Sequence, residues 1–403
     1  MIVGWRCAVC GSTVDVATPF PFRCPRSSPS DRHHVLHPLD VGAVVPRRDD
    51  PNPFVAYGPR LAWWAFARAN GMTELACEAL TREMAAGFVT TPFARSQLLT
   101  AELAGEVWVK DETGNVGGSH KGRHLVAILL HLLAAEALRL GARRRQPLAI
   151  ASCGNAAIAA ATLAGRVDWP LEVFVPDWAD DRVVAHLEQL GAAVERCPRR
   201  SSDPPGDPAV LRCRESVAAG AVPFSVQGPE NALCLDGGRT LGWELADAAV
   251  APNRVLVQVG GGALAACVGW GLGPSVRLDA VEAAGCAPLA GAWERASDLA
   301  PDEVASRWAE LMTPWPDPHS VADGILDDET YDWLGVFDVL RQSGGEPIVV
   351  AESSIVAANE LGRRMGIAVS ATGSAGLAAL LTSEEQSAER TAVLFTGARD
   401  TAR

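Results

Sequence analysis

Lysine is almost absent from this chain. Only Lys110 and Lys121 occur among its 403 residues, and arginine supplies every other basic side chain. A guanidinium group stays protonated and is no nucleophile, whereas a desolvated primary amine can lose its proton and form a Schiff base. Lys121 lies in a glycine-rich turn before the apolar run 125–133. This position favours a reactive amine at the first turn of a helix, although an ordinary solvent-exposed lysine is equally compatible with it.

The chain also lacks the features of a membrane or secreted protein. No apolar run approaches the ~18 residues of a membrane-spanning helix, and residues 1–10 show no signal-peptide pattern. The net charge of −13 argues against nucleic acid or an anionic membrane surface as a partner. Ten cysteines without a secretion signal are better explained as reduced thiols or metal ligands than as disulfides. We therefore expect a cytoplasmic enzyme.

Strand-like and helical segments alternate from Thr91 to the C-terminus, which predicts an α/β fold with mostly parallel strands and helices on both faces. The strand-like runs are 107–109, 148–150, 171–175, 254–259, 276–281 and 391–395. The helical runs are 120–140, 154–165, 180–190, 235–249, 353–365 and 372–382. Residues 52–88 have the apolar spacing of helices, whereas residues 1–40 show no convincing helix or strand period.

Four motifs stand in order along this region. They are Val109-Lys110-Asp111-Glu112-Thr113-Gly114-Asn115 with Gly118-Ser119-His120-Lys121, Ser152-Cys153-Gly154-Asn155-Ala156-Ala157, Val259-Gly260-Gly261-Gly262-Ala263-Leu264 and Leu394-Phe395-Thr396-Gly397. Together they resemble the fold-type II (tryptophan-synthase-β-like) pyridoxal-phosphate enzymes, most closely their threonine-synthase-like branch. The resemblance implies two interleaved three-layer α/β domains with mostly parallel sheets, and a homodimer.

The resemblance also implies a division of the chain. The expected parts are a zinc-ribbon-like segment, a helical cover and a pyridoxal-phosphate-dependent catalytic region, at residues 1–40, 41–90 and 91–403. Within the catalytic region, a smaller subdomain is expected at about 120–225, and a larger one from residues 91–119 and 226–403.

The resemblance assigns three residues to the ring and reactive carbon of the cofactor. Lys121 would bind pyridoxal 5'-phosphate covalently and then move protons at the substrate Cα. His120 would lie over or beside the ring, where an aromatic residue is often found. Thr396 would face the pyridine nitrogen with a neutral hydroxyl, which favours elimination and replacement over transamination.

The remaining assignments concern the substrate carboxylate and the cofactor's oxygens. Ser152, Cys153, Gly154 and Asn155 would bind the amino-acid substrate, and Asn155 would also donate its amide to the cofactor's 3-oxygen. The cofactor phosphate would lie on the backbone amides of Gly260, Gly261, Gly262 and Ala263, because glycines at a helix N-terminus form a good phosphate site. Cys153 stands where a hydroxyl residue is usual, and a small buried filler is an equally good explanation for it.

The expected reaction is elimination or replacement at Cβ or Cγ of an amino acid, as in a threonine-synthase-like carbon–oxygen lyase. Two departures from that branch are Gly122, where an acidic residue is usual, and Val116-Gly117, which replaces Pro-Thr. Ammonia-lyases and sulfur-transferring synthases on the same scaffold therefore remain alternatives. Arg123, Arg182 and Arg239 are candidates for binding a phosphate on the substrate, but arginine is so abundant here that an ordinary surface charge explains each of them better.

The glycine loop permits an interpretation of another class. Gly260, Gly262 and Ala265 match the G-x-G-x-x-A pattern of dinucleotide-binding proteins, and Glu282 follows at the end of the next expected strand. An NAD-dependent oxidoreductase is thus an alternative, but it leaves Lys121 and Thr396 without roles.

The N-terminal region carries a separate candidate site. Cys7 and Cys10 form a C-x-x-C pair, and Cys24 follows, whereas Ser27 stands where a fourth cysteine is expected. A histidine can complete a tetrahedral zinc site. His33, His34 and His37 are available, and His34 is favoured because Val35 and Leu36 begin an ordered element. Several threonine-synthase-like chains carry a zinc ribbon here, which implies a structural zinc. A degenerate ribbon that binds nothing is the alternative.

Overall fold

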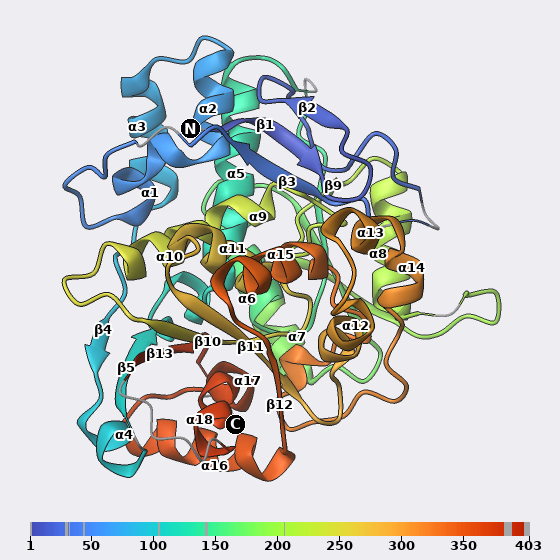
Figure 1. The fold of residues 1–403 in the computed structure, drawn as a ribbon. Coiled ribbons are helices and arrows are strands. Elements are labelled where there is room, and N and C mark those ends of the chain that lie inside the picture. The colour runs from blue at the N-terminus through green and yellow to red at the C-terminus, as the bar shows by residue number, and fades with distance from the viewer. Residues whose placement is uncertain are drawn as a thin grey trace.

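The structure is a computed structural model that describes residues 2–28, 31, 33–42, 45–103, 105–141, 144–204, 206–382 and 389–398. It contains three sheets, of three, six and four strands. The three-stranded sheet and the first helices lie at one end of the molecule, and the C-terminal helices lie at the other (Figure 1).

The three-stranded sheet is antiparallel and has the order β2-β1-β3, with β1 at Ile2–Cys7, β2 at Thr13–Asp15 and β3 at Leu36–Asp40. The sequence pattern missed these strands because they are short and their burial does not alternate regularly. In β1, for example, two adjacent residues are both buried. Trp5 and Leu36 join the same hydrophobic core as the helices that follow.

The helical cover expected at 52–88 is present. It consists of α1 (Pro53–Ala56), the 3-10 turn η1 (Gly58–Arg60), α2 (Ala62–Ala69) and α3 (Glu74–Met84). Its helices α2 and α3 both pack on α5 (Lys121–Ala137).

The four-stranded sheet is parallel throughout and has the order β8-β7-β6-β9. Its strands are β6 (Leu148–Ala151), β7 (Leu171–Pro176), β8 (Ala193–Cys197) and β9 (Val222–Pro223). Three helices lie between them in the chain, namely α6 (Asn155–Gly165), α7 (Asp181–Gln189) and α8 (Pro208–Ala218).

The six-stranded sheet has the order β12-β11-β10-β13-β5-β4 and is parallel except for its edge strand β4. Its strands are β4 (Phe93–Arg95), β5 (Glu106–Asp111), β10 (Arg254–Gln258), β11 (Arg277–Ala283), β12 (Pro347–Val350) and β13 (Arg390–Phe395). The last strand of the chain therefore lies in the middle of the sheet, between β10 and β5. This placement brings the C-terminal turn next to the loop that carries Lys121.

The remaining helices surround these sheets. They are α4 (Gln97–Glu102), η2 (Val116–Gly118), α9 (Cys234–Gly237), α10 (Arg239–Ala246), α11 (Ala263–Leu272), α12 (Pro288–Ala296), α13 (Pro301–Ser306), α14 (Trp308–Leu311), η3 (Asp323–Ile325), α15 (Trp333–Ser343), α16 (Glu352–Arg364), α17 (Ala371–Ser374), η4 (Ala375–Leu377) and α18 (Ala378–Thr382). The α/β class with mostly parallel sheets, expected from the sequence, is confirmed.

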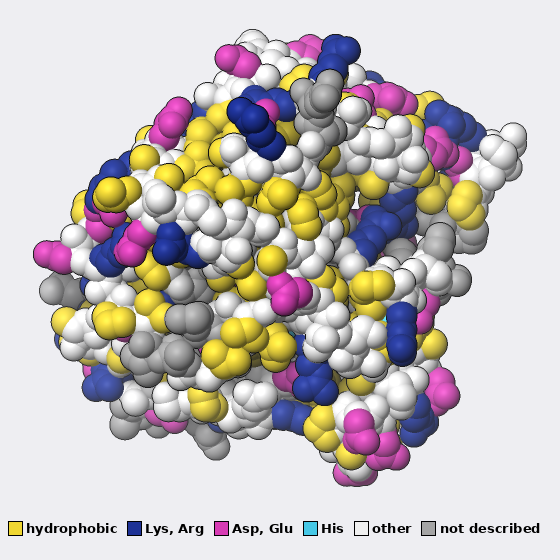
Figure 2. Space-filling model, turned by 90° about the horizontal axis from the view of Figure 1, so that it is seen from above, with side chains coloured by type: hydrophobic (Ala, Val, Ile, Leu, Met, Phe, Trp, Pro, Cys, Tyr) yellow, Lys and Arg dark blue, Asp and Glu magenta, His cyan; other side chains and the backbone are white. Residues whose placement is uncertain are grey.

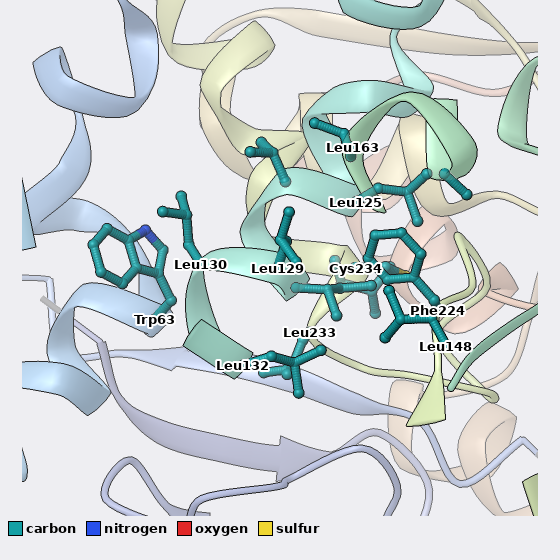
Figure 3. Close-up of a cluster of buried hydrophobic side chains, with 14 of the residues drawn as sticks. Trp63, Leu125, Leu129, Leu130, Leu132, Leu148, Leu163, Phe224, Leu233 and Cys234 are labelled. Carbon is teal, nitrogen blue, oxygen red and sulfur yellow. The ribbon is translucent and has the colours of Figure 1, made fainter. Parts of the chain in front are cut away.

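Helix α5 is the centre of the largest hydrophobic core. Every residue from Gly122 to Ala135 is buried, and most of these residues are apolar. Figure 3 shows leucines of α5 between Trp63 of α2 on one side and Phe224 and Leu148 on the other. The helix therefore joins the N-terminal cover to the four-stranded sheet.

Four charged side chains are buried together at the start of α5. Arg123 donates to Glu112, through Nε at 2.7 Å, and to Glu244, through Nη1 at 2.6 Å. Lys110 donates to the same Glu244 at 2.5 Å and to the backbone oxygen of Thr91 at 2.7 Å. All four side chains are at most 1% exposed. This group, here called the buried ion cluster, joins β5, α5 and α10.

The surface mixes both signs of charge with hydrophobic side chains, as the face in Figure 2 shows. Among the described helices, none combines the length and the apolar character that crossing a bilayer requires.

The buried ion cluster yields a stability prediction. Glu244→Gln leaves Lys110 and Arg123 with too little negative charge in a dry environment, so we expect a loss of about 3–5 kcal/mol in unfolding free energy. The matched control is Glu102→Gln, which breaks the exposed pair between Glu102 and Arg364 and should cost less than about 1 kcal/mol. Thermal unfolding of both variants measures the difference. Equal melting temperatures would contradict a structural role for the cluster.

Candidate active site

Lys121 is the first residue of α5. The loop before it packs closely on α6, and this packing requires a glycine. Gly117 has a φ of +75°, and a Cβ there would lie 2.8 Å from the Cα of Ala159 in α6. Only glycine permits this close approach. The Lys121 side chain is half-buried, and its amine makes no hydrogen bond to a described residue. Burial lowers its pKa, against the opposing charges of Asp327 and Asp332. A lowered pKa is what a reactive amine needs.

The C-terminal turn pairs with this loop. The His120 N–H donates to the Thr396 backbone oxygen at 2.9 Å, and the Ala398 N–H donates to the Gly118 oxygen at 2.9 Å. A β-bridge between Ser119 and Gly397 lies between these two bonds. Thr396 is therefore fixed beside the lysine segment, as the sequence motifs predicted.

The Thr396 hydroxyl has a partner that sequence reasoning missed. It accepts a hydrogen bond of 2.8 Å from Nε2 of Gln258, the last residue of β10. The same amide nitrogen also donates to the backbone oxygen of Gly373 at 2.8 Å. Because the hydroxyl accepts from Gln258, its own proton is free for another acceptor. The only sequence signal for Gln258 is that a polar residue ends a buried strand shortly before the glycine loop.

His120 is a neutral imidazole in this arrangement. Its Nδ1 lies 3.0 Å from the Thr396 backbone oxygen, so Nδ1 carries the proton. Burial lowers the pKa of His120 well below its usual value. Its Nε2 is buried and has no partner among the described residues. The ring nitrogen Nε2 of His120, next to Lys121, can therefore still accept a hydrogen bond.

The loop before α6 also reaches this site. Asn155 begins α6, and its Nδ2 would lie 2.6 Å from a Cβ placed on Gly397. The Gly154 N–H donates to the Ser152 hydroxyl at 3.2 Å, and Gly154 itself is exposed. Burial raises the pKa of the Cys153 thiol, so the thiol is protonated near neutral pH. This loop therefore lies beside the C-terminal turn that carries Thr396.

The glycine loop connects β10 to α11. Gly262 has a φ of +90°, and a Cβ on Gly260 would lie 2.8 Å from the Ile325 Cα. Ala263, the first residue of α11, is buried. The segment from Ala322 to Trp333, here called the covering segment, lies against these glycines. Its Asp332 N–H donates to the Gly261 oxygen at 2.8 Å.

The covering segment contributes two acids that no sequence pattern indicated. Burial raises the pKa of Asp327 to about 6 and that of Asp332 to about 7, and the charge of Lys121 lowers both. Asp332 accepts from the Gly228 N–H at 3.1 Å through one oxygen. Its other oxygen, Oδ1, is buried without a partner in the described part of the chain.

Glu282 has a structural role that argues against the dinucleotide interpretation. Its two oxygens accept from the N–H groups of Leu289 at 3.0 Å and Ala290 at 2.8 Å, at the start of α12. The Glu282 side chain therefore caps the start of α12. Glu282 is only 1% exposed. It is not available to bind a ribose.

The N-terminal cysteines and one histidine form a compact group. The ligand atoms of Cys7, Cys10, Cys24 and His34 all lie within 4.8 Å of one another. His34 Nδ1 is 3.5 Å from Cys7 Sγ, and its Nε2 is 2.9 Å from an oxygen of Asp31. A carboxylate on the second ring nitrogen is typical of metal-binding histidines.

The other two candidate histidines are used elsewhere. His33 accepts from the Trp333 indole at 3.2 Å and stacks on Trp308. His37 lies against Trp270. Of the three candidates, the structure brings only His34 to the cysteines.

Comparisons with known proteins agree with this geometry. The family model described as "Pyridoxal-phosphate dependent enzyme" matches residues 85–397. Similar solved structures include a threonine deaminase from T.th., with a TM-score of 0.64 and 24% identity over 82% of this chain and 100% of that one. Maize serine racemase has a TM-score of 0.64 and 20% identity, over 81% and 93% of the two chains. Diaminopropionate ammonia lyase from Escherichia coli has a TM-score of 0.61 and 17% identity, over 81% and 90%. A search of curated proteins found no match.

The residues of the site fit pyridoxal phosphate. The Lys121 amine has no hydrogen-bond partner among the described residues, and the buried Nε2 of His120 has none either. The Thr396 hydroxyl retains a free proton. The glycines before α11 offer backbone N–H groups at a helix N-terminus, which suit a phosphate. An amine, a hydroxyl donor and an anion-binding loop are therefore present together.

The geometry predicts which lysine carries the cofactor. Borohydride reduction should attach it to Lys121 and not to Lys110, because the Lys110 amine is buried against Glu244. Peptide mass spectrometry identifies the labelled residue. Lys121→Ala should lose the visible absorption band of the bound cofactor, whereas Lys110→Arg should keep it. Recovery of the label on Lys110 would overturn the assignment.

Proposed function

The chain belongs to the pyridoxal-phosphate dependent enzymes, and within that family we propose that it is a lyase or synthase acting at Cβ or Cγ of an amino acid. The observation that carries this proposal is the hydrogen bond from Gln258 to the Thr396 hydroxyl. It leaves Thr396 as a neutral donor at the position expected to face the cofactor ring.

Lys121 is proposed as the residue that binds the cofactor and moves the proton. Pyridoxal phosphate, when bound, supplies an electron sink for the substrate's reacting carbon. The Lys121 amine takes the proton from the substrate Cα and can return it to the departing group or to carbon. Its lowered pKa leaves a larger fraction of the amine unprotonated than an exposed lysine would have.

Thr396 is proposed to set the kind of reaction. Its hydroxyl would donate a hydrogen bond to the ring nitrogen but would not give up its proton fully, since an alcohol is a very weak acid. The nitrogen would therefore stay largely uncharged, which would moderate the electron sink and favour elimination or replacement over transamination. Gln258 holds the hydroxyl in the orientation that this hydrogen bond needs.

The remaining groups are proposed to bind and orient. The Ser152 hydroxyl and the amides of Cys153 and Gly154 hold the substrate carboxylate at the exposed mouth of the site. Asn155 donates its amide to the cofactor's 3-oxygen. The amides from Gly260 to Ala263, at the N-terminus of α11, hold the phosphate. His120 lies beside the ring as a neutral imidazole.

Carbon–oxygen cleavage, as in the threonine-synthase-like branch, is the reaction we propose within this class, but on a substrate whose leaving group is not a phosphate. Arg123, a candidate for binding such a phosphate, is fully buried between Glu112 and Glu244. Arg239, a second candidate, is 6% exposed and paired with Asp236 and Asp40. Arg182, the third candidate, is paired with Asp180. Each of the three arginines therefore already has a carboxylate partner.

An amino-acid ammonia-lyase reaction is the alternative within the same class. A threonine deaminase and a diaminopropionate ammonia lyase have similar solved structures. An ammonia-lyase would use the same Lys121 and Thr396, and so would a sulfur-transferring synthase. A homodimer and a cytoplasmic location remain predictions of the sequence.

An amino-acid panel tests the proposed function. The holoenzyme is incubated with serine, threonine, 2,3-diaminopropionate and O-phosphohomoserine, and keto acid, ammonium and phosphate are measured. We expect turnover of an unphosphorylated amino acid, and a lower rate in Thr396→Val with the cofactor still bound. Thr396→Asp should increase transamination as a side reaction. Preference for O-phosphohomoserine would contradict the substrate assignment, and unchanged kinetics in both variants would contradict the role of Thr396.

We also propose that Cys7, Cys10, Cys24 and His34 bind one structural zinc ion. Three thiolates and one imidazole form a closed tetrahedral set without an open position for a substrate. The metal would tie the turn after β1 to the loop before β3. It would therefore support the N-terminal sheet and not the chemistry at Lys121.

Elemental analysis tests the zinc site. We expect about one zinc per chain, as a single four-ligand set requires, and loss of that zinc in Cys10→Ser with an unchanged cofactor spectrum. Cys213→Ser in α8 is the matched control and should keep the metal. Metal-free protein with an ordered N-terminal sheet would show that the cysteines bind nothing.

A further inference from the structure

The Asp327 carboxylate lies in the anion-binding loop of this site. A Cβ on Gly260 would meet its Oδ2 at 2.8 Å, and one on Gly261 would meet it at 3.3 Å. A carboxylate oxygen therefore lies directly against the first two glycines of the proposed phosphate site.

Carboxylate and phosphate have the same requirement at such a loop. Backbone N–H groups at a helix N-terminus bind whichever anion reaches them. Two anions a few ångströms apart also repel each other strongly in a poorly solvated site. A phosphate bound to this loop would therefore lie close to the Asp327 carboxylate and be repelled by its charge.

The covering segment is attached on both sides of Asp327. The Gly324 N–H donates to the Thr372 hydroxyl at 2.9 Å, and the Asp332 N–H donates to the Gly261 oxygen at 2.8 Å. These bonds involve the neighbouring backbone and not the Asp327 side chain. The carboxylate can thus leave the glycine loop by rotation, without detaching the segment.

We propose that the Asp327 carboxylate, which lies against the glycine loop, lowers the affinity of this loop for the cofactor phosphate. Asp327 is then a residue that sets cofactor affinity: its negative charge opposes the phosphate, and the phosphate binds more tightly when this charge is removed or the side chain turns away. This inference rests on the proposed phosphate-binding role of Gly260–Ala263.

Cofactor titration of the cofactor-free protein tests this effect. Asp327→Asn removes the charge with little change in size, so it should bind pyridoxal phosphate at least about tenfold more tightly than the parent chain. Asp328→Asn is the matched control. It removes the same charge one residue away, from a residue outside the buried core, and should change affinity by no more than about twofold, because solvated charges are screened. Asp327→Ala is the second variant and should also bind more tightly.

Inorganic phosphate separates this proposal from the proposed function. Its dissociation constant, measured from the shift in thermal unfolding, should fall in Asp327→Asn and not in Asp328→Asn. If Lys121 did not bind the cofactor, the visible band would be absent from every variant, while the difference in phosphate affinity would persist. Equal or weaker binding of both ligands by Asp327→Asn would overturn the role of Asp327.

Discussion

The buried ion cluster is the interaction on which the rest of the site depends. Lys110, Glu112, Arg123 and Glu244 come from β5, the loop after it, α5 and α10, and each is shielded from water. Removing any one of them leaves a charge in a dry environment, which is costly. The cluster therefore fixes the point at which α5 begins. Lys121, two residues before Arg123, is positioned by the same constraint.

The parallel sheets bring the other loops to that point. The lysine segment follows the carboxyl end of β5, the C-terminal turn follows β13 and the glycine loop follows β10, and these strands are neighbours in one sheet. Loops at the carboxyl ends of adjacent parallel strands converge, which is where α/β proteins bind ligands. Gln258 makes this convergence specific, because it ends β10 and reaches the Thr396 hydroxyl at the end of β13.

Local patterns predicted the parts of the site that depend on local chemistry. Lys121, the glycine loop and the C-x-x-C pair were recognisable because each motif determines its own backbone or ligand geometry. Gln258, Asp327 and Asp332 were missed, since their roles arise from contacts between segments far apart in the chain. The sequence favours a surface charge for Arg123, and the structure corrects this because Glu112 and Glu244 pair with it in the interior. The N-terminal strands were missed because their buried residues do not alternate along the sequence. These residues are buried by packing on the core that contains α2 and α5.

A crystal structure of the cofactor-loaded enzyme is the most direct test of this account. It should show density continuous with Nζ of Lys121, a phosphate on the amides from Gly260 to Ala263 and the Thr396 hydroxyl within hydrogen-bonding distance of the ring nitrogen. A phosphate bound away from the glycine loop, or a Lys121 side chain free of density, would contradict the central claim that these loops form one pyridoxal-phosphate site.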